Sequence, residues 1–592
     1  MGKMLVNRTG GHGGPPLQMD RCVPILFLVV VLVTCITVRA QSPSPTPKIA
    51  DEVTNGSIDG KVVNESGQPL AGASLFIRSV GSSATIRNTT SDLDGNFRVN
   101  GLERALYTVA GVAPTYTPAV PVDSTTTTYY RIGDSVRVEL VRGGVITGAV
   151  TNSSGEPVIA VRVRCTMIRD ANGQIPKNEI FASQEQSTDD RGIYRMYGVS
   201  PGTYLVSAGG SGFVTSPTAF DFDIPTFAPS STRDNAAEVT VRSGEETNVD
   251  IRYRGEPGHT ISGTVKSSGN NSNTSLTLTS GGDSIPFGNT FQFPGARGFA
   301  FNGLPDGDYD LFATEAIASP TATFASIAVA EIRKITVKGA DVTGLELVPK
   351  LLGSISGRIA LELSKLPECQ GKRPPVLAEM VVQIERPEKE LEKADPLTTR
   401  FAGNTAAPDT GGAFVLRTMM PGRYRFNPRF YAHYWYLQSI TTSSAGAKPQ
   451  KIDAAGSWTT LKAGEQLTNI TITLAEGAAS VRGRVPVTEG AALPAGMVVY
   501  LMPSEQDKVD DVLRFFVSNI EADGTFAFNN LPPGKYLVLT QTNAEAQTAT
   551  SAKLRQPEAA TARAKLRKTA ETKKIEIELK PCQNVNDYQL KQ

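Results

Sequence analysis

His259 and His433 are the only histidines after residue 40 of this 592-residue sequence, and they lie far apart. Zinc peptidases need His and carboxylate ligands at fixed spacing, and neither residue belongs to a His-x-x-Glu or His-Glu-x-x-His pattern. No Gly-x-Ser-x-Gly elbow accompanies either histidine. The sequence therefore predicts a protein that is not an enzyme, with no catalytic residues, no metal site and no cofactor. Paired carboxylates, as in glycosidases, are the one catalytic arrangement left open.

An aromatic run, Phe430-Tyr-Ala-His-Tyr-Trp-Tyr436, contains one of only two tryptophans. Exposed Tyr and Trp rings can stack on sugar faces while their polar groups bind hydroxyls. In an extended strand, alternation sends Tyr431, His433 and Trp435 to one face and the other aromatic residues to the opposite face. These three residues are the candidate ligand-binding residues, and packing in a core is the alternative for about half of the run.

Several aspartates lie at turns and form a further candidate site: Asp92, Asp94, Asp189, Asp190 and Asp523. Calcium needs about six to eight oxygen ligands, and one Asp-x-Asp-Gly stretch supplies too few. We therefore interpret these carboxylates as turn-forming groups.

The first 40 residues are typical of a targeting segment. Arg21 precedes an apolar run from Val23 to Val38, which ends in a small-x-small pattern at Ala40. We expect a cleaved signal peptide over residues 1–40 and a Ser/Pro linker over 41–55, and an uncleaved N-terminal anchor is the alternative. The formal net charge of +1 gives no argument for nucleic acid as a partner.

One sequence pattern recurs five times, and the structural units that it forms must position any site. Its central part is DGTFAFNNLPPGKYLVL (Asp523–Leu539), with further copies at Ser91–Val109, Thr188–Val206, Ala296–Phe312 and Asp409–Phe426. A glycine-bearing strand precedes each copy, and the five glycines are Gly60, Gly148, Gly263, Gly357 and Gly483. An alternating strand follows each copy, and these closing strands are VRVELV, TNVDIRY, TGLELVP, TNITITLA and KIEIELK.

Each repeat predicts a small sandwich of strands. Alternating apolar residues make half-buried strands, and glycine permits the tight hairpin turn. The Tyr after each second turn is expected to pack inward while its hydroxyl binds backbone near the bend, as in a tyrosine corner. These tyrosines are Tyr107, Tyr204, Tyr309, Tyr424 and Tyr536. An Ala/Arg/Lys-rich run between Thr548 and Lys574 predicts a helix.

The first repeat resembles the carboxypeptidase regulatory-like domain, a transthyretin-like β-sandwich. The resemblance rests on Gly60, Val62, Gly67, Pro69, Leu70, Gly72, Ala73, Asp92, Asp94, Gly95 and Phe97. Repeats two and five follow the pattern well. Repeat three lacks the acidic turn residues, and repeat four carries an insertion. The resemblance implies an extracytoplasmic module grouped with carbohydrate-binding-like folds.

We therefore predict an all-β tandem array of about five Ig-like or transthyretin-like sandwiches, with a short helix near the C-terminus. The expected ranges are 56–142, 143–254, 258–349, 352–475 and 478–592. The predicted function is non-catalytic binding in the cell envelope or outside the cell, with carbohydrate as the leading ligand by family resemblance. The alternative is a surface scaffold or adhesion protein that binds other envelope proteins. Cys369 and Cys582 could pair, and Cys165 is expected in a core.

Overall fold

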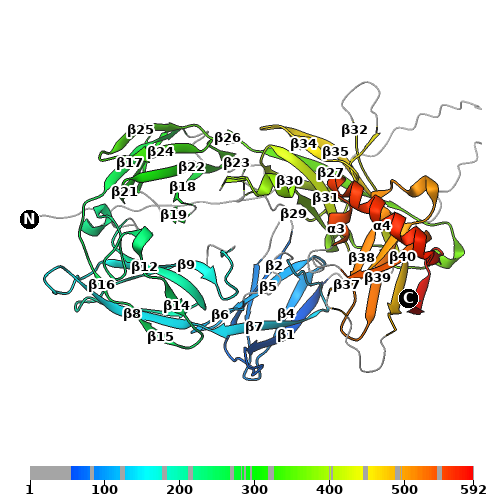
Figure 1. Ribbon diagram of the computed structural model, residues 1–592, viewed down its shortest axis with the longest axis horizontal. Coiled ribbons are helices and arrows are strands. Elements are labelled where there is room, and N and C mark those ends of the chain that lie inside the picture. The colour runs from blue at the N-terminus through cyan, green and yellow to red at the C-terminus, as the bar shows by residue number, and fades with distance from the viewer. Residues whose placement is uncertain are drawn as a thin grey trace, which may run out of the picture. The chain divides into compact units, whose positions relative to one another are not determined.

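Short strands and tight turns make up most of the chain in the computed structural model (Figure 1). The chain divides into Met1–Glu52 and Val53–Gln592. The structure describes residues 55–80, 86–119, 127–176, 183–210, 218–266, 272–281, 283–285, 289–293, 296–317, 326–395, 397–398, 401, 405–443, 451–486, 494, 496–542 and 550–590. The predicted signal peptide and almost all of the linker lie outside these residues.

The first two sandwiches each pack two sheets. In the first, the strand orders are β4-β1-β7-β6 and β3-β2-β5; in the second, they are β11-β8-β15 and β10-β9-β12-β13, with β16 on β8 and β14 on β12. The strands are β1 (Asn55–Asn64), β2 (Ser74–Ser79), β3 (Ile86–Thr90), β4 (Asn96–Glu103), β5 (Tyr107–Val112), β6 (Tyr116–Pro118), β7 (Ser135–Arg142), β8 (Gly144–Thr151), β9 (Arg162–Asp170), β10 (Ser183–Ser187), β11 (Ile193–Val199), β12 (Gly202–Ala208), β13 (Thr226–Phe227), β14 (Val239–Val241), β15 (Glu246–Asn248) and β16 (Ile251–Arg252). Short 3-10 turns occur at η2 (Ala219–Phe222) and η3 (Arg233–Asn235).

The third sandwich pairs its strands as β20-β21-β17-β25 and β19-β18-β22-β23-β26, with β24 on β22. Its strands are β17 (His259–Lys266), β18 (Ser272–Ser280), β19 (Asp283–Ile285), β20 (Asn289–Phe293), β21 (Ala296–Leu304), β22 (Gly307–Ile317), β23 (Ser326–Val329), β24 (Arg333–Val337), β25 (Val342–Leu347) and β26 (Lys350–Leu351).

The fourth sandwich has sheets β30-β27-β35-β32-β33 and β29-β28-β31-β34, and the fifth has β39-β36-β42 and β38-β37-β40-β41. Their strands are β27 (Gly353–Glu362), β28 (Val381–Glu385), β29 (Thr405–Ala406), β30 (Ala413–Met419), β31 (Gly422–Arg429), β32 (Trp435–Ser443), β33 (Lys451–Asp453), β34 (Thr459–Leu461), β35 (Gln466–Glu476), β36 (Ala479–Arg484), β37 (Met497–Pro503), β38 (Phe516–Asn519), β39 (Thr525–Leu531), β40 (Gly534–Thr542), β41 (Glu576–Leu579) and β42 (Asn584–Gln589). Helical turns are α1 (Glu388–Leu391), α3 (Ser551–Leu554), α4 (Ala560–Lys573), η4 (Pro367–Cys369), η5 (Leu377–Glu379), η6 (Gln506–Lys508), η7 (Val512–Arg514) and η9 (Pro557–Ala559).

All five sandwiches share one strand pairing, which confirms the predicted fold class. The glycine-bearing opening strand pairs antiparallel with the strand after the first turn and parallel with a closing strand. The triplets are β1 with β4 and β7, β8 with β11 and β15, β17 with β21 and β25, β27 with β30 and β35, and β36 with β39 and β42.

The predicted closing strand of the fifth repeat is wrong. KIEIELK contributes β41, which pairs with β40 in the other sheet, whereas β42 pairs parallel with the opening strand β36. Both segments alternate apolar and polar residues, so periodicity alone does not tell one sheet from the other. By its pairing with the Tyr-bearing strand, β41 corresponds to β14, β24 and β34.

The corner tyrosines are confirmed in all five repeats. Each is buried, with an exposed fraction of at most 3%, and each donates its hydroxyl hydrogen to the carbonyl oxygen four residues earlier. These bonds are Tyr107 to Glu103 (2.7 Å), Tyr204 to Ser200 (2.7 Å), Tyr309 to Pro305 (2.6 Å), Tyr424 to Met420 (2.5 Å) and Tyr536 to Pro532 (2.7 Å). Each ring therefore ties the core to the bend that precedes its own strand.

The predicted turn role is confirmed for Asp92, Asp189 and Asp523. Asp92 Oδ1 accepts hydrogen bonds from the backbone nitrogens of Asp94 and Asn96, at 3.0 and 2.8 Å. Asp189 and Asp409 make the same pair of bonds in their own turns. A side chain that accepts from the backbone two and four residues ahead stabilises the tight turn.

The predicted C-terminal helix is confirmed as α4, which Figure 1 shows across the fifth sandwich. Pro557 starts the 3-10 turn that leads into it, where its missing N–H costs nothing. Ala570, Leu554 and Leu566 pack on the outer face of the sheet that contains β37 and β40. That sheet is thus buried on both faces, which explains the unbroken apolar run of β37.

Candidate functional site

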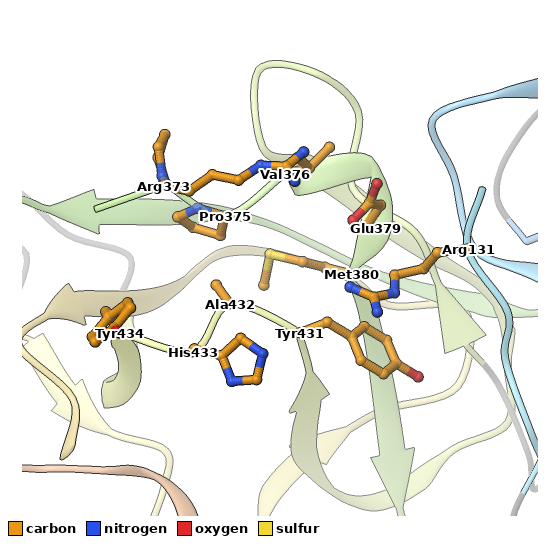
Figure 2. Close-up of a pocket in the computed structure, with 11 residues that line it drawn as sticks. Arg131, Arg373, Pro375, Val376, Glu379, Met380, Tyr431, Ala432, His433 and Tyr434 are labelled. Carbon is orange, nitrogen blue, oxygen red and sulfur yellow. The ribbon is translucent and has the colours of Figure 1, made fainter. Parts of the chain in front are cut away.

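The aromatic run lies at the edge of a cleft in the fourth sandwich, which we call the outer cleft (Figure 2). Its volume is about 300 Å³. The side chains of Tyr431, His433 and Tyr434 lie on one side, and Arg373, Pro375 and Glu379 lie on the other. Val376 and Met380 complete this second wall, and Arg131 of the first sandwich also contributes.

The structure separates the three predicted ligand-binding residues. Tyr431 is 40% exposed and His433 is also exposed, and both line the outer cleft. Trp435 is fully buried and packs in the core of the fourth sandwich. The expectation that its ring shares a face with the other two is therefore wrong, and its indole offers no face for stacking on a ligand.

A turn explains this difference. Strand β32 begins only at Trp435, and the chain before it forms a turn in which the backbone nitrogen of Trp435 donates to the Ala432 carbonyl oxygen at 3.4 Å. Strand alternation does not apply to such a turn, so Tyr431 and His433 face outward while Trp435 enters the core.

Hydrogen bonds from the fifth sandwich hold this turn in place. Asn530 Nδ2 donates to the carbonyl oxygens of Ala432 and Trp435, at 2.5 and 2.8 Å. Asn584 Nδ2 donates to the Tyr434 hydroxyl oxygen at 3.1 Å. The aromatic turn is therefore fixed by its neighbour, which favours a preformed binding surface.

A disulfide joins the same two sandwiches. Cys369 and Cys582 are bonded across 213 positions of sequence, which confirms the pairing left open by the sequence. Cys369 belongs to η4 and lies shortly before the Arg373–Met380 wall of the outer cleft. Cys165 is a buried free thiol, as expected.

Charged groups surround the aromatic rings of the outer cleft. Lys372 Nζ lies 4.5 Å from the centre of the Tyr434 ring, and the Arg131 guanidinium lies 4.8 Å from that of Tyr431. Each cation therefore lies within the range of a cation–π contact with its ring. Burial raises the pKa of Tyr431, so its hydroxyl stays protonated at neutral pH and can donate a hydrogen bond.

A second cavity, of about 420 Å³, lies where the fourth and fifth sandwiches meet, and we call it the junction pocket. Its polar lining consists of Arg429, Tyr431, Asn529, Asn530 and Arg555. Its apolar lining includes Phe430 and Phe516. Tyr431 therefore borders both cavities.

Sequence reasoning missed the junction pocket because its arginine and asparagine residues come from three distant segments. Arg429 ends β31, Asn529 and Asn530 belong to β39, and Arg555 follows α3. No local pattern marks such a set. The one signal in the sequence was the adjacent aromatic run.

Among the residues that the structure describes, no group of three or more His, Cys, Asp or Glu side chains could hold a metal ion. Of the described residues that line the outer cleft, Glu379 is the one with a carboxylate.

Comparison with known proteins finds a family match for the first sandwich. The family model of the carboxypeptidase regulatory-like domain matches residues 57–133. No curated protein matches the chain. The other four sandwiches repeat the strand pairing and the corner tyrosine of this regulatory-like domain.

Solved structures show a likeness at low sequence identity. The shaft pilin SpaA from Lactobacillus rhamnosus GG has 10% identity over 34% of this chain and 98% of its own, with a TM-score of 0.17. GBS52, the minor pilin of Streptococcus agalactiae, has 12% identity over 34% and 96%, with a TM-score of 0.19. The Bacillus anthracis TIE protein has 13% identity over 72% and 76%, with a TM-score of 0.14. Scores this low support no inference about function.

The regulatory-like domain match ends well before either cavity. Both cavities depend on the fourth and fifth sandwiches, so their chemistry has to be argued from their own residues. In the described part of the chain, no helix has the length and apolar character that crossing a membrane requires.

Proposed function

We propose that this chain is a non-catalytic, extracytoplasmic binding protein that holds carbohydrate in the outer cleft. The observation that carries the proposal is the pair of exposed side chains, Tyr431 and His433, on a fixed turn at the edge of that cleft. An aromatic face beside polar groups suits a sugar ring, whose faces are apolar and whose rim carries hydroxyls.

The lining of the outer cleft supports binding rather than hydrolysis. Glycosidases use two carboxyl groups that flank the scissile bond, whereas Glu379 is the one acid among the described residues that line the cleft. The same described lining contains no Ser, Thr or Cys that could serve as a nucleophile beside His433.

The disulfide supports the proposed location. Structural disulfides form and persist in oxidising compartments, such as the periplasm and the cell exterior. The Cys369–Cys582 bond is thus in keeping with the targeting segment expected over residues 1–40. Polysaccharide or other envelope components are the partners that this location would supply.

Substitution at Tyr431 tests the proposal. We expect the chain after residue 40 to bind oligosaccharides on a glycan array, and Tyr431→Ala to weaken binding at least tenfold in calorimetry, about 1.4 kcal/mol. Tyr197→Ala is the matched control, because Tyr197 is a 64% exposed tyrosine in the second sandwich. Absence of glycan binding, or equal binding by both variants, would contradict the proposal.

Protein binding is the second candidate, and one edge strand favours it. Strand β11 ends its sheet, and its outward side chains include Ile193 and Tyr197, which are 39% and 64% exposed. A partner could add a strand at such an edge. If Tyr197→Ala abolishes capture of an envelope protein while Tyr431→Ala does not, this candidate replaces the first.

A further inference from the structure

Two arginines line the junction pocket without a carboxylate partner. Arg429 and Arg555 make no ion pair with any residue in the described ranges. The Arg555 side chain also makes no hydrogen bond in those ranges, and its guanidinium lies 4.9 Å from the centre of the Phe516 ring. Its Nε is shielded from solvent and has no partner.

Two acids whose charges act on Arg555 already form ion pairs with other arginines. Glu385 pairs with Arg425 at 2.9 Å, and Asp511 pairs with Arg514 at 3.3 Å. Both acids act on Arg555 through their charge, but neither forms an ion pair with its guanidinium, so the buried cation keeps the capacity to bind an anion. Burial, and then the nearby Arg425, lower the pKa of Arg555 to about 10, and it therefore stays charged at neutral pH.

The other lining groups suit a ligand that also carries hydroxyls. Asn529 and Asn530 line the pocket, and Asn530 Nδ2 is already used in two bonds to the aromatic turn. The Oδ1 atom of Asn530 remains an acceptor, and the amide of Asn529 offers both a donor and an acceptor. Phe430 and Tyr431 supply apolar ring surface beside these amides.

We propose that the junction pocket is an anionic subsite that receives the carboxylate or sulfate group of an acidic oligosaccharide. Arg429 and Arg555 bind the acidic group, because a guanidinium can hold a carboxylate or sulfate through paired hydrogen bonds. The amides bind the neighbouring hydroxyls. Tyr431 borders both cavities, so one chain of sugars reaches from the outer cleft into the pocket.

This inference rests on the proposed carbohydrate binding and adds the class of sugar. It favours a saccharide over an acidic peptide because aromatic rings and amides accompany the cations. An acidic peptide remains an outcome of the test.

The test compares acidic and neutral ligands directly. Trisaccharides that contain uronate, trisaccharides that contain sulfate, and neutral trisaccharides of the same length are presented to the chain after residue 40, with free poly-glutamate as competitor. We expect the acidic trisaccharides to bind at least tenfold more tightly than the neutral ones. Arg429→Gln and Arg555→Gln should each remove most of that preference, because they weaken the binding of the acidic trisaccharides much more than that of the neutral ones.

Two further variants keep the test interpretable. Arg555→Lys retains the charge and should retain part of the preference, and thermal unfolding checks that each variant is folded. Arg137→Gln is the matched control, because Arg137 is an exposed arginine of the first sandwich. This control variant should change neither the affinity for the acidic trisaccharides nor the affinity for the neutral ones.

The outcomes separate the two proposals. Neutral binding that depends on Tyr431, without any preference for acidic sugars, overturns the anionic subsite alone. Absence of binding to every trisaccharide overturns both proposals. Competition by poly-glutamate as strong as that of the acidic trisaccharides overturns the saccharide assignment and indicates an acidic peptide.

Discussion

The ring of Phe414 lies against Gly357 across the sheet, where a β-carbon on Gly357 would come within 2.7 Å of the Phe414 Cζ atom. The same β-carbon would also collide with the carbonyl oxygen of Ile470 on the parallel closing strand. Equivalent cross-strand pairs recur in the other sandwiches: Gly60 with Phe97, Gly148 with Tyr194, Gly263 with Phe299, and Gly483 with Phe526. Glycine at this position lets an aromatic ring and a third strand approach one backbone.

Substitution of Gly357 tests this arrangement. We expect Gly357→Ala to lower the free energy of unfolding of the fourth sandwich by about 1–3 kcal/mol, because the added methyl group overpacks the site. Both tryptophans, Trp435 and Trp458, belong to this sandwich, so tryptophan fluorescence during urea unfolding follows it selectively.

Gly411→Ala is the control in the same sandwich. A β-carbon there would meet its nearest atom, Asp409 Oδ1, at an ordinary 3.4 Å. Its effect should stay within about 0.5 kcal/mol. Equal unfolding midpoints for the two variants would contradict the packing role of Gly357.

Much of the fold could be predicted from the sequence because its signals are local. The glycine turns and the corner tyrosines each act within a few residues, and the structure confirms them. The pairing of Gly357 with Phe414 could not be derived, because it depends on strand register. KIEIELK was assigned to the wrong sheet for a related reason, because a local pattern does not show which strand a segment will pair with.

The candidate site was only partly predictable. Tyr431 and His433 line a cleft as the aromatic composition suggested, but a turn moved Trp435 into the core. Arg429 and Arg555 were not singled out, because their shared pocket exists only after two sandwiches meet. The assembly of the two sandwiches therefore determines which residues share a pocket, and the periodicity of the sequence does not show this.

Tyr424 should be a strong determinant of stability in the fourth sandwich. Tyr424→Ala removes a fully buried ring and should cost about 3–5 kcal/mol. Tyr424→Phe keeps the ring but removes both the bond to the Met420 carbonyl and the bond that Arg386 Nη1 donates to the hydroxyl oxygen, and it should cost about 2–3 kcal/mol. Tyr204→Ala alters the corner of the second sandwich and should leave the tryptophan-detected transition unchanged. A loss below about 1 kcal/mol for Tyr424→Ala would show that the ring is not essential to the corner.

Alkaline pH should destabilise the array through its corner tyrosines. Burial raises the pKa of Tyr309 from 10.0 to about 12, and it also raises those of Tyr204, Tyr424 and Tyr536. Between pH 10 and pH 12 the unfolded chain loses these protons while the folded chain retains them, so the free energy of unfolding falls as pH rises. Stability is unaffected by these groups below pH 10.

Absorbance at 295 nm measures this directly. The corner tyrosines should ionise only when circular dichroism reports unfolding. Ionisation of all tyrosines near pH 10 in the folded protein would contradict the burial argument.

The disulfide between Cys369 and Cys582 should stabilise the pair of sandwiches that forms both cavities. Cys369→Ser together with Cys582→Ser should lower the free energy of unfolding by about 2–4 kcal/mol, as the loss of a disulfide usually does. Tryptophan fluorescence again reports the transition. Cys165→Ser is the control, since Cys165 is a free thiol in the second sandwich and should leave that transition unchanged.

Thiol titration in denaturant supplies an independent measurement of the same bond. A chain that begins after residue 40 contains Cys165, Cys369 and Cys582, and it should show one reactive thiol before reduction and three afterwards. Three thiols before reduction would contradict the bond. Loss of ligand binding on reduction, with both sandwiches still folded, would show that the covalent link also maintains the geometry of the cavities, because the Cys369 segment leads directly into the wall of the outer cleft.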